Sequence, residues 1–231
     1  MKTQMIKKLS FAAAIAGLGI AMAMPVHAAF KLTLTPSGGG AVTVTDGGVG
    51  DSNPDVGAIT FIGSLTGWSV NVTTGLSKPV LGSATVASMD LNSVNVSSAG
   101  GGSLTIELTD TDFNALSPTS FSMSIGGTTN GSVTYDAYID AGNVEFGQGT
   151  LVGNLGPYAP IAFSESTAGG GPFAGGPFSM TQVVTITHAG ATSSSFDAEL
   201  RAVPEPGTLA LFGMSILGFG IGLRRRLGRA A

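Results

Sequence analysis

Short alternating segments, separated by turn residues, limit what residues 29–202 can fold into. The clearest one runs from Ser103 to Thr109, where Leu104, Ile106 and Leu108 alternate with polar side chains. Side chains two positions apart lie on the same face of a strand, so this pattern predicts a strand with one buried face. Sustained helical periodicity is absent from this region.

Nine further segments have a similar β-rich character: Lys31–Thr35, Ala41–Thr45, Ala58–Ile62, Trp68–Thr73, Asp90–Val96, Ser120–Ile125, Val133–Ile139, Ser179–His188 and Phe196–Ala202. About ten to twelve short strands at this spacing predict an all-β fold, an antiparallel β-sandwich with a jelly-roll-like arrangement as one variant. A β-helix is a minor alternative, because the sequence has no strict repeat. The glycine-rich segment from Gly169 to Gly176 is expected to be a flexible loop.

The first 28 residues have the layout of a secretory signal peptide. Three lysines precede an uncharged apolar run from Leu9 to Met24, and small residues lead up to Ala28. We expect cleavage after Ala28, with Ala29 as the second choice. An uncleaved membrane anchor is the alternative interpretation.

The C-terminus contains a second apolar segment, from Thr208 to Leu223, which ends at an arginine cluster. Its sixteen residues would form a helix of about 24 Å, slightly short of the usual membrane span. Arg224, Arg225 and Arg226 follow at once, and arginines after a membrane helix favour a cytoplasmic C-terminus. The sequence therefore predicts a membrane helix over 208–223, a basic cytoplasmic end over 224–231 and an exported domain between the two ends. A buried core helix would leave the terminal arginines unexplained.

Pro204, Glu205 and Pro206 stand directly before this apolar segment. In this order, the three parts of residues 203–231 resemble the sorting tail of the PEP-CTERM family of exported bacterial proteins. The resemblance implies that exosortase, a membrane-embedded cysteine transpeptidase, processes the chain near this motif. It further implies an inner-membrane precursor that is then transferred to the cell surface or to an extracellular polysaccharide matrix. It implies nothing about the activity of the exported domain.

The residues of the motif are consistent with processing on their own chemistry. Pro204 and Pro206 disfavour regular structure and favour an extended segment, which a membrane protease could bind. Glu205 is the only charge between Arg201 and Arg224 and could serve in recognition. The alternative is a stiff linker before a permanent anchor.

Charge excludes one class of partner. Residues 29–203 contain three basic and thirteen acidic side chains, a net charge of −10 against −4 for the whole chain. A domain with so few cations cannot neutralise phosphates, so we expect no nucleic-acid binding.

Residues suited to catalysis or metal binding are few. The chain has no cysteine, and His188 is the only histidine after the signal peptide, so a zinc site is not expected. No nucleophile elbow accompanies His188, and a lone histidine at a strand end is expected at the surface. Calcium prefers clustered carboxylates and carbonyl oxygens, and Asp110 and Asp112 after a strand are the best candidates for it. Turn formation by aspartate is the simpler interpretation.

Aromatic side chains leave glycan binding open. Trp68, the only tryptophan, could stack on a sugar ring, but burial in a sandwich core is the more frequent fate of tryptophan. Tyr135, Tyr138 and Tyr158 have the same two interpretations. We therefore expect a non-enzymatic protein of the cell surface or matrix, with a structural or adhesive role in exopolysaccharide or biofilm. The alternative is a glycan-binding module or a glycan-active enzyme.

Overall fold

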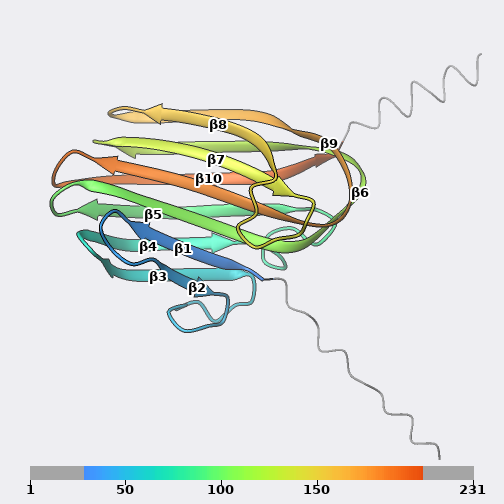
Figure 1. Cartoon of the computed structure of the whole chain (residues 1–231), viewed down its shortest axis with the longest axis horizontal. Coiled ribbons are helices and arrows are strands. Elements are labelled where there is room, and N and C mark those ends of the chain that lie inside the picture. Colours follow the sequence, from blue (N-terminus) through green and yellow to red (C-terminus); the bar gives the residue numbers. More distant parts are fainter. Residues whose placement is uncertain (1–28, 205–231) are drawn as a thin grey trace, which may run out of the picture.

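The computed structural model describes residues 29–204, which form strands and no helix (Figure 1). The signal peptide over 1–28 and the predicted membrane helix over 208–223 lie outside the described residues. No helix long and apolar enough to cross a membrane occurs in the part that is described. The strands are β1 Lys31–Pro36, β2 Val42–Thr45, β3 Ala58–Leu65, β4 Trp68–Leu76, β5 Ser88–Ser98, β6 Gly102–Thr129, β7 Ser132–Asp140, β8 Thr150–Tyr158, β9 Ala162–His188 and β10 Thr192–Pro204.

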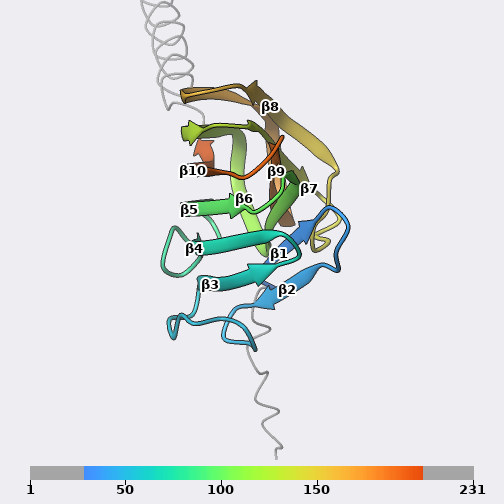
Figure 2. The ribbon, with the colours of Figure 1, turned by 90° about the vertical axis from the view of Figure 1, so that its left-hand side faces the viewer.

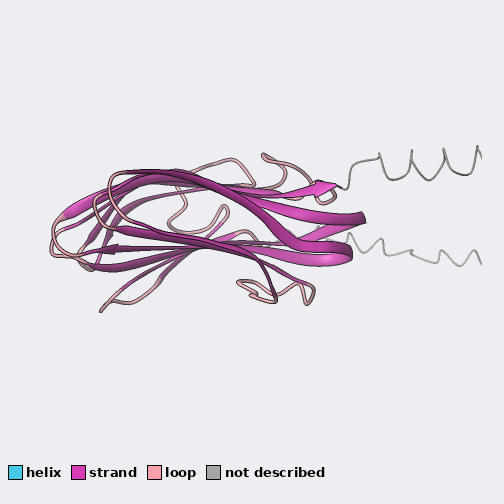
Figure 3. Cartoon of the chain, turned by 90° about the horizontal axis from the view of Figure 1, so that it is seen from above, coloured by secondary structure: helices cyan, strands magenta, loops and turns pink. Residues whose placement is uncertain are grey.

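The strands pack as two layers, which Figure 3 shows edge-on. In layer A the order is β2, β1, the first half of β6, the second half of β9, β7 and β8. In layer B the order is β3, β4, β5, β10, the second half of β6 and the first half of β9. All of these pairs are antiparallel, so the prediction of an antiparallel β-sandwich is confirmed (Figure 2).

Two strands belong to both layers. β6 and β9 pair with each other over almost their whole length, and their register shifts repeatedly between Asp110 and Phe121. Bulges of this kind bend a strand pair, and here the bend carries the pair from layer A into layer B. The predicted strands Ser103–Thr109 and Ser120–Ile125 are therefore two halves of one strand.

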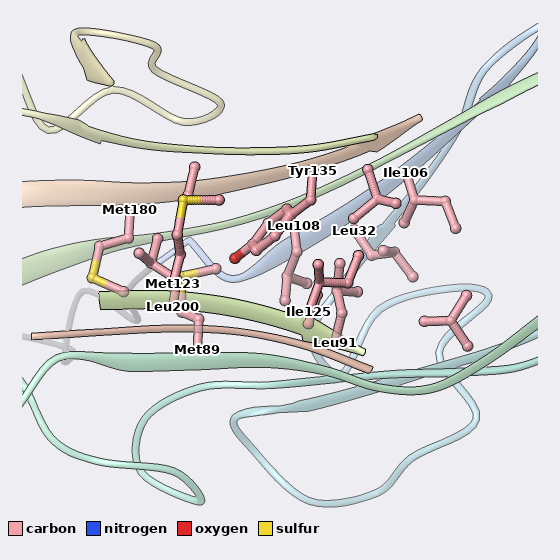
Figure 4. Close-up of a cluster of buried hydrophobic side chains, with 14 of the residues drawn as sticks. Leu32, Met89, Leu91, Ile106, Leu108, Met123, Ile125, Tyr135, Met180 and Leu200 are labelled. Atoms are coloured by element: carbon pink, nitrogen blue, oxygen red, sulfur yellow. The ribbon is translucent and has the colours of Figure 1, made fainter. Parts of the chain in front are cut away.

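Alternate side chains from both layers fill the space between them (Figure 4). Leu104, Ile106 and Leu108 are fully buried, as their alternation predicts. Leu91 of β5 and Leu200 of β10 contribute from layer B and are equally buried. The period of two in the sequence is thus what produces one shared core.

The glycine-rich segment predicted as a loop is part of strand β9, so that prediction was wrong. A side chain at Gly171 would lie 2.5 Å from the carbonyl oxygen of Thr119, and one at Gly176 would lie 2.8 Å from the Cα of Asn114. Glycine lets β9 pass close to β6 where the pair bends. Phe173 and Phe178, which follow these glycines, pack together with ring centroids 4.9 Å apart.

Strand β8 was not among the predicted segments. Gly153, Gly156 and Pro157 interrupt its alternation, although Val152 and Leu155 are buried. Gly153 has a physical reason, since a side chain there would lie 2.6 Å from the methyl group of Thr167. Because β8 and β9 approach so closely, glycine stands where β8 would otherwise carry a side chain, and the alternation that predicts a strand is lost.

The two ends of the sandwich differ in what they carry. The base is the end where β1 begins, with Lys31 opposite Thr109, and where β10 ends, with Pro204 opposite Thr119. The opposite end, the tip, holds six connections of uncharged residues only: 37–41, 66–67, 99–101, 130–131, 159–161 and 189–191. The predicted sorting tail therefore continues from the base.

Candidate functional site

An open hollow of about 630 Å³ lies on the outer face of layer B. It crosses β5, β10, β6 and β9. Besides Ile125, its lining consists of small or acidic residues, among them Asp90, Ser124, Ser164, Glu165, Ser166, Asp197 and Glu199. A second, separate hollow of about 390 Å³ lies nearer the tip on the same strands, and its lining includes Asn95, Thr128, Asn130, Ile161, Ser193 and Ser195. We call the two together the layer B groove.

Strand register brings the acids of the groove together. Asp197 and Glu199 are two residues apart on β10 and so share its outer face. Asp90 on β5 is the direct cross-strand partner of Glu199. A bulge opposite Asp197 places Ser93 in a left-handed conformation, and the Ser93 amide donates a hydrogen bond to the Asp197 carboxylate at 2.6 Å.

The groove is electrostatically negative. Burial is the main cause that raises the pKa of Asp90, and the neighbouring charges of Asp197 and Glu199 raise it further, while a hydrogen bond from Asn92 lowers it. The nearest cation is Arg201, whose Nε lies 3.9 Å from Glu199 in an exposed pair. Carboxylates, hydroxyls and amides at this density can accept and donate hydrogen bonds to a hydroxyl-rich ligand.

The carboxylate group of the groove was not singled out from the sequence. The alternation in β10 shows that Asp197 and Glu199 share a face, but pairing with Asp90 depends on a register across about a hundred residues. No local pattern encodes that register. No group of three or more histidine, aspartate or glutamate side chains in the described residues has metal-binding geometry.

The aromatic side chains considered for sugar stacking do not line the groove. Trp68 is only 3% exposed, so its predicted burial is confirmed, and Tyr135 is buried as well. Tyr138 lies on β7 in layer A, where it pairs with Thr181. Tyr158 stacks on Phe163 at 4.6 Å and donates a hydrogen bond to Glu165.

His188 is buried at the tip, so its predicted place at the surface was wrong. Its side chain is 2% exposed, and the ring of Trp68 covers it at 4.7 Å. Nδ1 lies 2.9 Å from the hydroxyl of Ser98, and Nε2 lies 2.8 Å from that of Ser194. Both nitrogens are satisfied by neutral groups, which is why burial is tolerated here.

The direction of these hydrogen bonds follows from counting protons. Ser98 donates its only hydroxyl proton to the carbonyl of Gly190, so it accepts from Nδ1–H of His188. Neutral His188 must then accept at Nε2 from Ser194, which in turn accepts from Thr129. Burial lowers the pKa of His188, in agreement with a neutral ring.

The two calcium candidates have protein partners at the base. The carboxylate of Asp110 is fully buried and accepts from Lys78 Nζ at 2.8 Å, from the Ser77 hydroxyl at 2.5 Å and from the Thr111 amide. Asp112 has a positive φ of 61° at the bulge and accepts from Asn143 at 2.7 Å. Both residues lie within β6 rather than after a strand. Lys78 already neutralises Asp110.

Of the processing residues, the structure describes only two. The Ala29 amide donates to the Thr111 hydroxyl at 2.9 Å, and Pro204 ends strand β10. Ala28, Glu205, Pro206 and the three arginines Arg224, Arg225 and Arg226 lie outside the described residues.

Residues 202–226 match the PEP-CTERM protein-sorting motif. The resemblance drawn from the proline and glutamate residues and the apolar segment is thereby confirmed, and the match is consistent with an exosortase substrate. No curated protein matches the chain in sequence.

Several solved structures are similar to part of this chain. One is TmCBM61 in complex with β-1,4-galactotriose, with a TM-score of 0.34 and 11% identity over 61% of this chain and 92% of that one. Another is the mannan-recognising module TmCBM27, with a TM-score of 0.27 and 13% identity over 59% of this chain and 88% of that one. A third is a mutant of CBM29-2, with a TM-score of 0.28 and 9% identity over 75% of this chain and 87% of that one. At these scores the likenesses carry no argument about function.

Proposed function

From the PEP-CTERM tail, which indicates an exported, membrane-anchored precursor sorted to the cell surface, we propose a non-enzymatic surface or matrix protein that binds extracellular polysaccharide. Exosortase is the proposed processing enzyme, and the inner membrane holds the precursor. The structural or adhesive role in biofilm belongs to this proposal.

The observation that carries the proposal is the layer B groove. It runs across four neighbouring strands, and hydroxyl, amide and carboxylate groups line it. A sugar chain presents hydroxyl groups along its length, so an extended polar groove on a rigid sheet suits it better than a closed pocket would. Because strands hold most of these groups, and only Asn130 and Ile161 come from turns, little conformational entropy is lost on binding.

Charge narrows the class of polysaccharide. Burial is the main cause that raises the pKa of Asp90, and repulsion from Asp197 and Glu199 adds to it. An acidic polysaccharide would add to this repulsion, whereas a neutral one would not and one with free amino groups would relieve it. The groove therefore favours neutral or amino-bearing sugar chains.

The test is binding of the fragment 29–204, which contains the whole described core, to the extracellular polysaccharide of the producing cells. Replacing Asp197 with Asn together with Glu199→Gln should weaken binding about tenfold or more. Glu107→Gln is the matched control, because Glu107 lies on the outer face of layer A. Equal binding by all three proteins would contradict the groove as the site.

One observation favours a glycan-active enzyme as the second candidate. A carboxyl group whose pKa is raised by burial, next to further carboxyl groups, is the arrangement that glycosidases use for acid and base. Asp90 would be the acid, and Asp197 or Glu199 the base or nucleophile. Release of reducing ends from the same polysaccharide, abolished by Asp90→Asn, would support the enzyme and contradict a purely binding role.

A further inference from the structure

The sorting motif and the folded domain share residues. The motif match begins at residue 202, whereas strand β10 continues to Pro204. Ala202, Val203 and Pro204 are thus at once the last residues of a strand and the first residues of the sorting motif. No linker separates the sandwich from the segment that the processing enzyme reads.

All three residues pair with β6, and Ala202 is also held on the other side of β10. Val203 pairs with Ser120 of β6, and Pro204 pairs with Thr119. On the other side of the strand, the Ala202 amide donates a hydrogen bond to the carbonyl of Ala87 at 2.8 Å. A peptide is commonly bound in an enzyme cleft as an extended strand through its backbone groups. In this protein, some of the backbone groups of Ala202–Pro204 already form hydrogen bonds with neighbouring strands and loops.

Chain length leaves little room for the enzyme. Only Glu205, Pro206 and Gly207 stand between Pro204 and the predicted membrane helix that starts at Thr208. Four residue steps span at most about 14 Å when fully extended. An enzyme embedded in the membrane therefore meets the motif directly against the base of the sandwich.

We propose that the end of strand β10 must detach from β6 before the membrane enzyme processes the chain, so that pairing at Ala202–Pro204 limits the rate of sorting. The inference rests on the sorting motif and is independent of polysaccharide binding. It distinguishes this chain from one in which a free linker presents the motif.

The first test separates the motif from the strand. Inserting Gly-Ser-Gly-Ser-Gly-Ser-Ala-Val after Val203 leaves Ala202 and Val203 in the strand and gives the motif its own copy of them. Its distance from the membrane segment is unchanged. We expect the half-time of processing, followed by pulse labelling and intact mass in the producing cells, to fall at least threefold. A six-residue Gly-Ser insertion after Gly190, at the tip, is the control and should leave it unchanged.

A second test works in the opposite direction. The chain has no cysteine, so Ser120→Cys with Val203→Cys introduces a single pair at directly opposed positions of two antiparallel strands. Such positions have the Cα separation that a disulfide needs. The oxidised double variant should be processed at least threefold more slowly than the Val203→Cys single variant, and reductant should abolish the difference.

The outcomes separate cleanly. Equal rates for wild type and the spacer variant, or for the oxidised and single variants, would overturn the proposal. A wild-type chain that keeps its full tail mass in producing cells would contradict sorting itself, and the proposal with it. Loss of polysaccharide binding alone would leave the proposal standing.

Discussion

The base and the tip of the sandwich close the same two layers by different means. At the base, strands bend between layers, and a buried ion pair joins Lys78 to Asp110. At the tip, uncharged turns connect the strands, and His188, the one buried ionisable group among the described residues there, is held neutral by hydroxyls. One end thus buries opposite charges together, while the other buries no charge.

The difference teaches how each end should fail. A buried ion pair is costly to break on one side only, because the remaining charge has no compensation. A neutral histidine that is hydrogen-bonded to hydroxyls is destabilised when it gains a proton. Both ring nitrogens then donate, so one donor in the hydrogen-bond network is left without an acceptor. The base should therefore be sensitive to loss of a side chain, and the tip to pH.

The largest effect is expected for Lys78→Met at the base. Lys78 is 12% exposed and Asp110 fully buried, so the variant leaves an unpaired buried carboxyl group. We expect the free energy of unfolding near pH 7 to fall by about 3–5 kcal/mol, measured by urea denaturation. Because burial raises the pKa of Asp110, the loss should shrink as the pH falls and Asp110 becomes protonated.

Two controls bracket this result. Lys31→Met breaks an ion pair with Glu145 that is 25% and 42% exposed, and it should cost less than about 1 kcal/mol. Adding Asp110→Asn to Lys78→Met should restore most of the stability. Equal losses for the two lysine variants would contradict the special role of the buried pair.

A smaller effect is expected where the β6–β9 pair bends. A side chain at Gly171 would lie 2.5 Å from the Thr119 carbonyl oxygen and 2.7 Å from the Ser120 Cα, both backbone atoms that cannot move aside cheaply. Gly171→Ala should therefore lower the free energy of unfolding by about 1–3 kcal/mol. At the tip, Gly190 has open space around it, and Gly190→Ala should stay within about 0.5 kcal/mol of wild type. Thermal denaturation of the two variants makes the comparison.

The same glycines mark the limit of prediction from the sequence. Alternation predicted strands such as Val133–Ile139 correctly, because each has one buried face. It failed at Gly169–Gly176, where close contact with another strand, distant in sequence, selects glycine. The expectation that a lone histidine at a strand end lies at the surface also failed for His188, since its partners Ser98 and Ser194 come from two other strands. Pairing across distant strands is likewise what assembles Asp90 with Glu199.

At the tip, acid should act through His188. Its pKa in the folded protein is lowered by burial, so the folded state binds its proton less readily than the unfolded state does. Above about pH 6.5 both states are neutral, and the stability is complete. As the pH falls below that value, the unfolded state protonates first and stability is lost, by at most about 1.4 kcal/mol per pH unit, until the folded-state pKa is reached.

The measurement is urea denaturation between pH 7.5 and about pH 5.5, for wild type and His188→Asn, which keeps one donor and one acceptor but does not titrate. Asp90, Glu107 and Asp110 have raised pKa values and act in the opposite direction, since their folded states favour the proton. They are present in both proteins, so the difference isolates His188. The same pH slope for both would show that His188 does not titrate in this range.

The smallest effect is expected from calcium at the base. A cation at Asp110 would meet the ammonium group of Lys78, and Asp112 already accepts a hydrogen bond from Asn143. Millimolar calcium, the range in which many extracellular modules bind it, should change the free energy of unfolding by less than about 0.5 kcal/mol relative to a chelator. A larger gain that Asp112→Asn abolishes would establish the calcium site that the sequence suggested. It would also mean that the base admits a second cation beside Lys78. The buried carboxylate of Asp110 would then be neutralised by two cations instead of one.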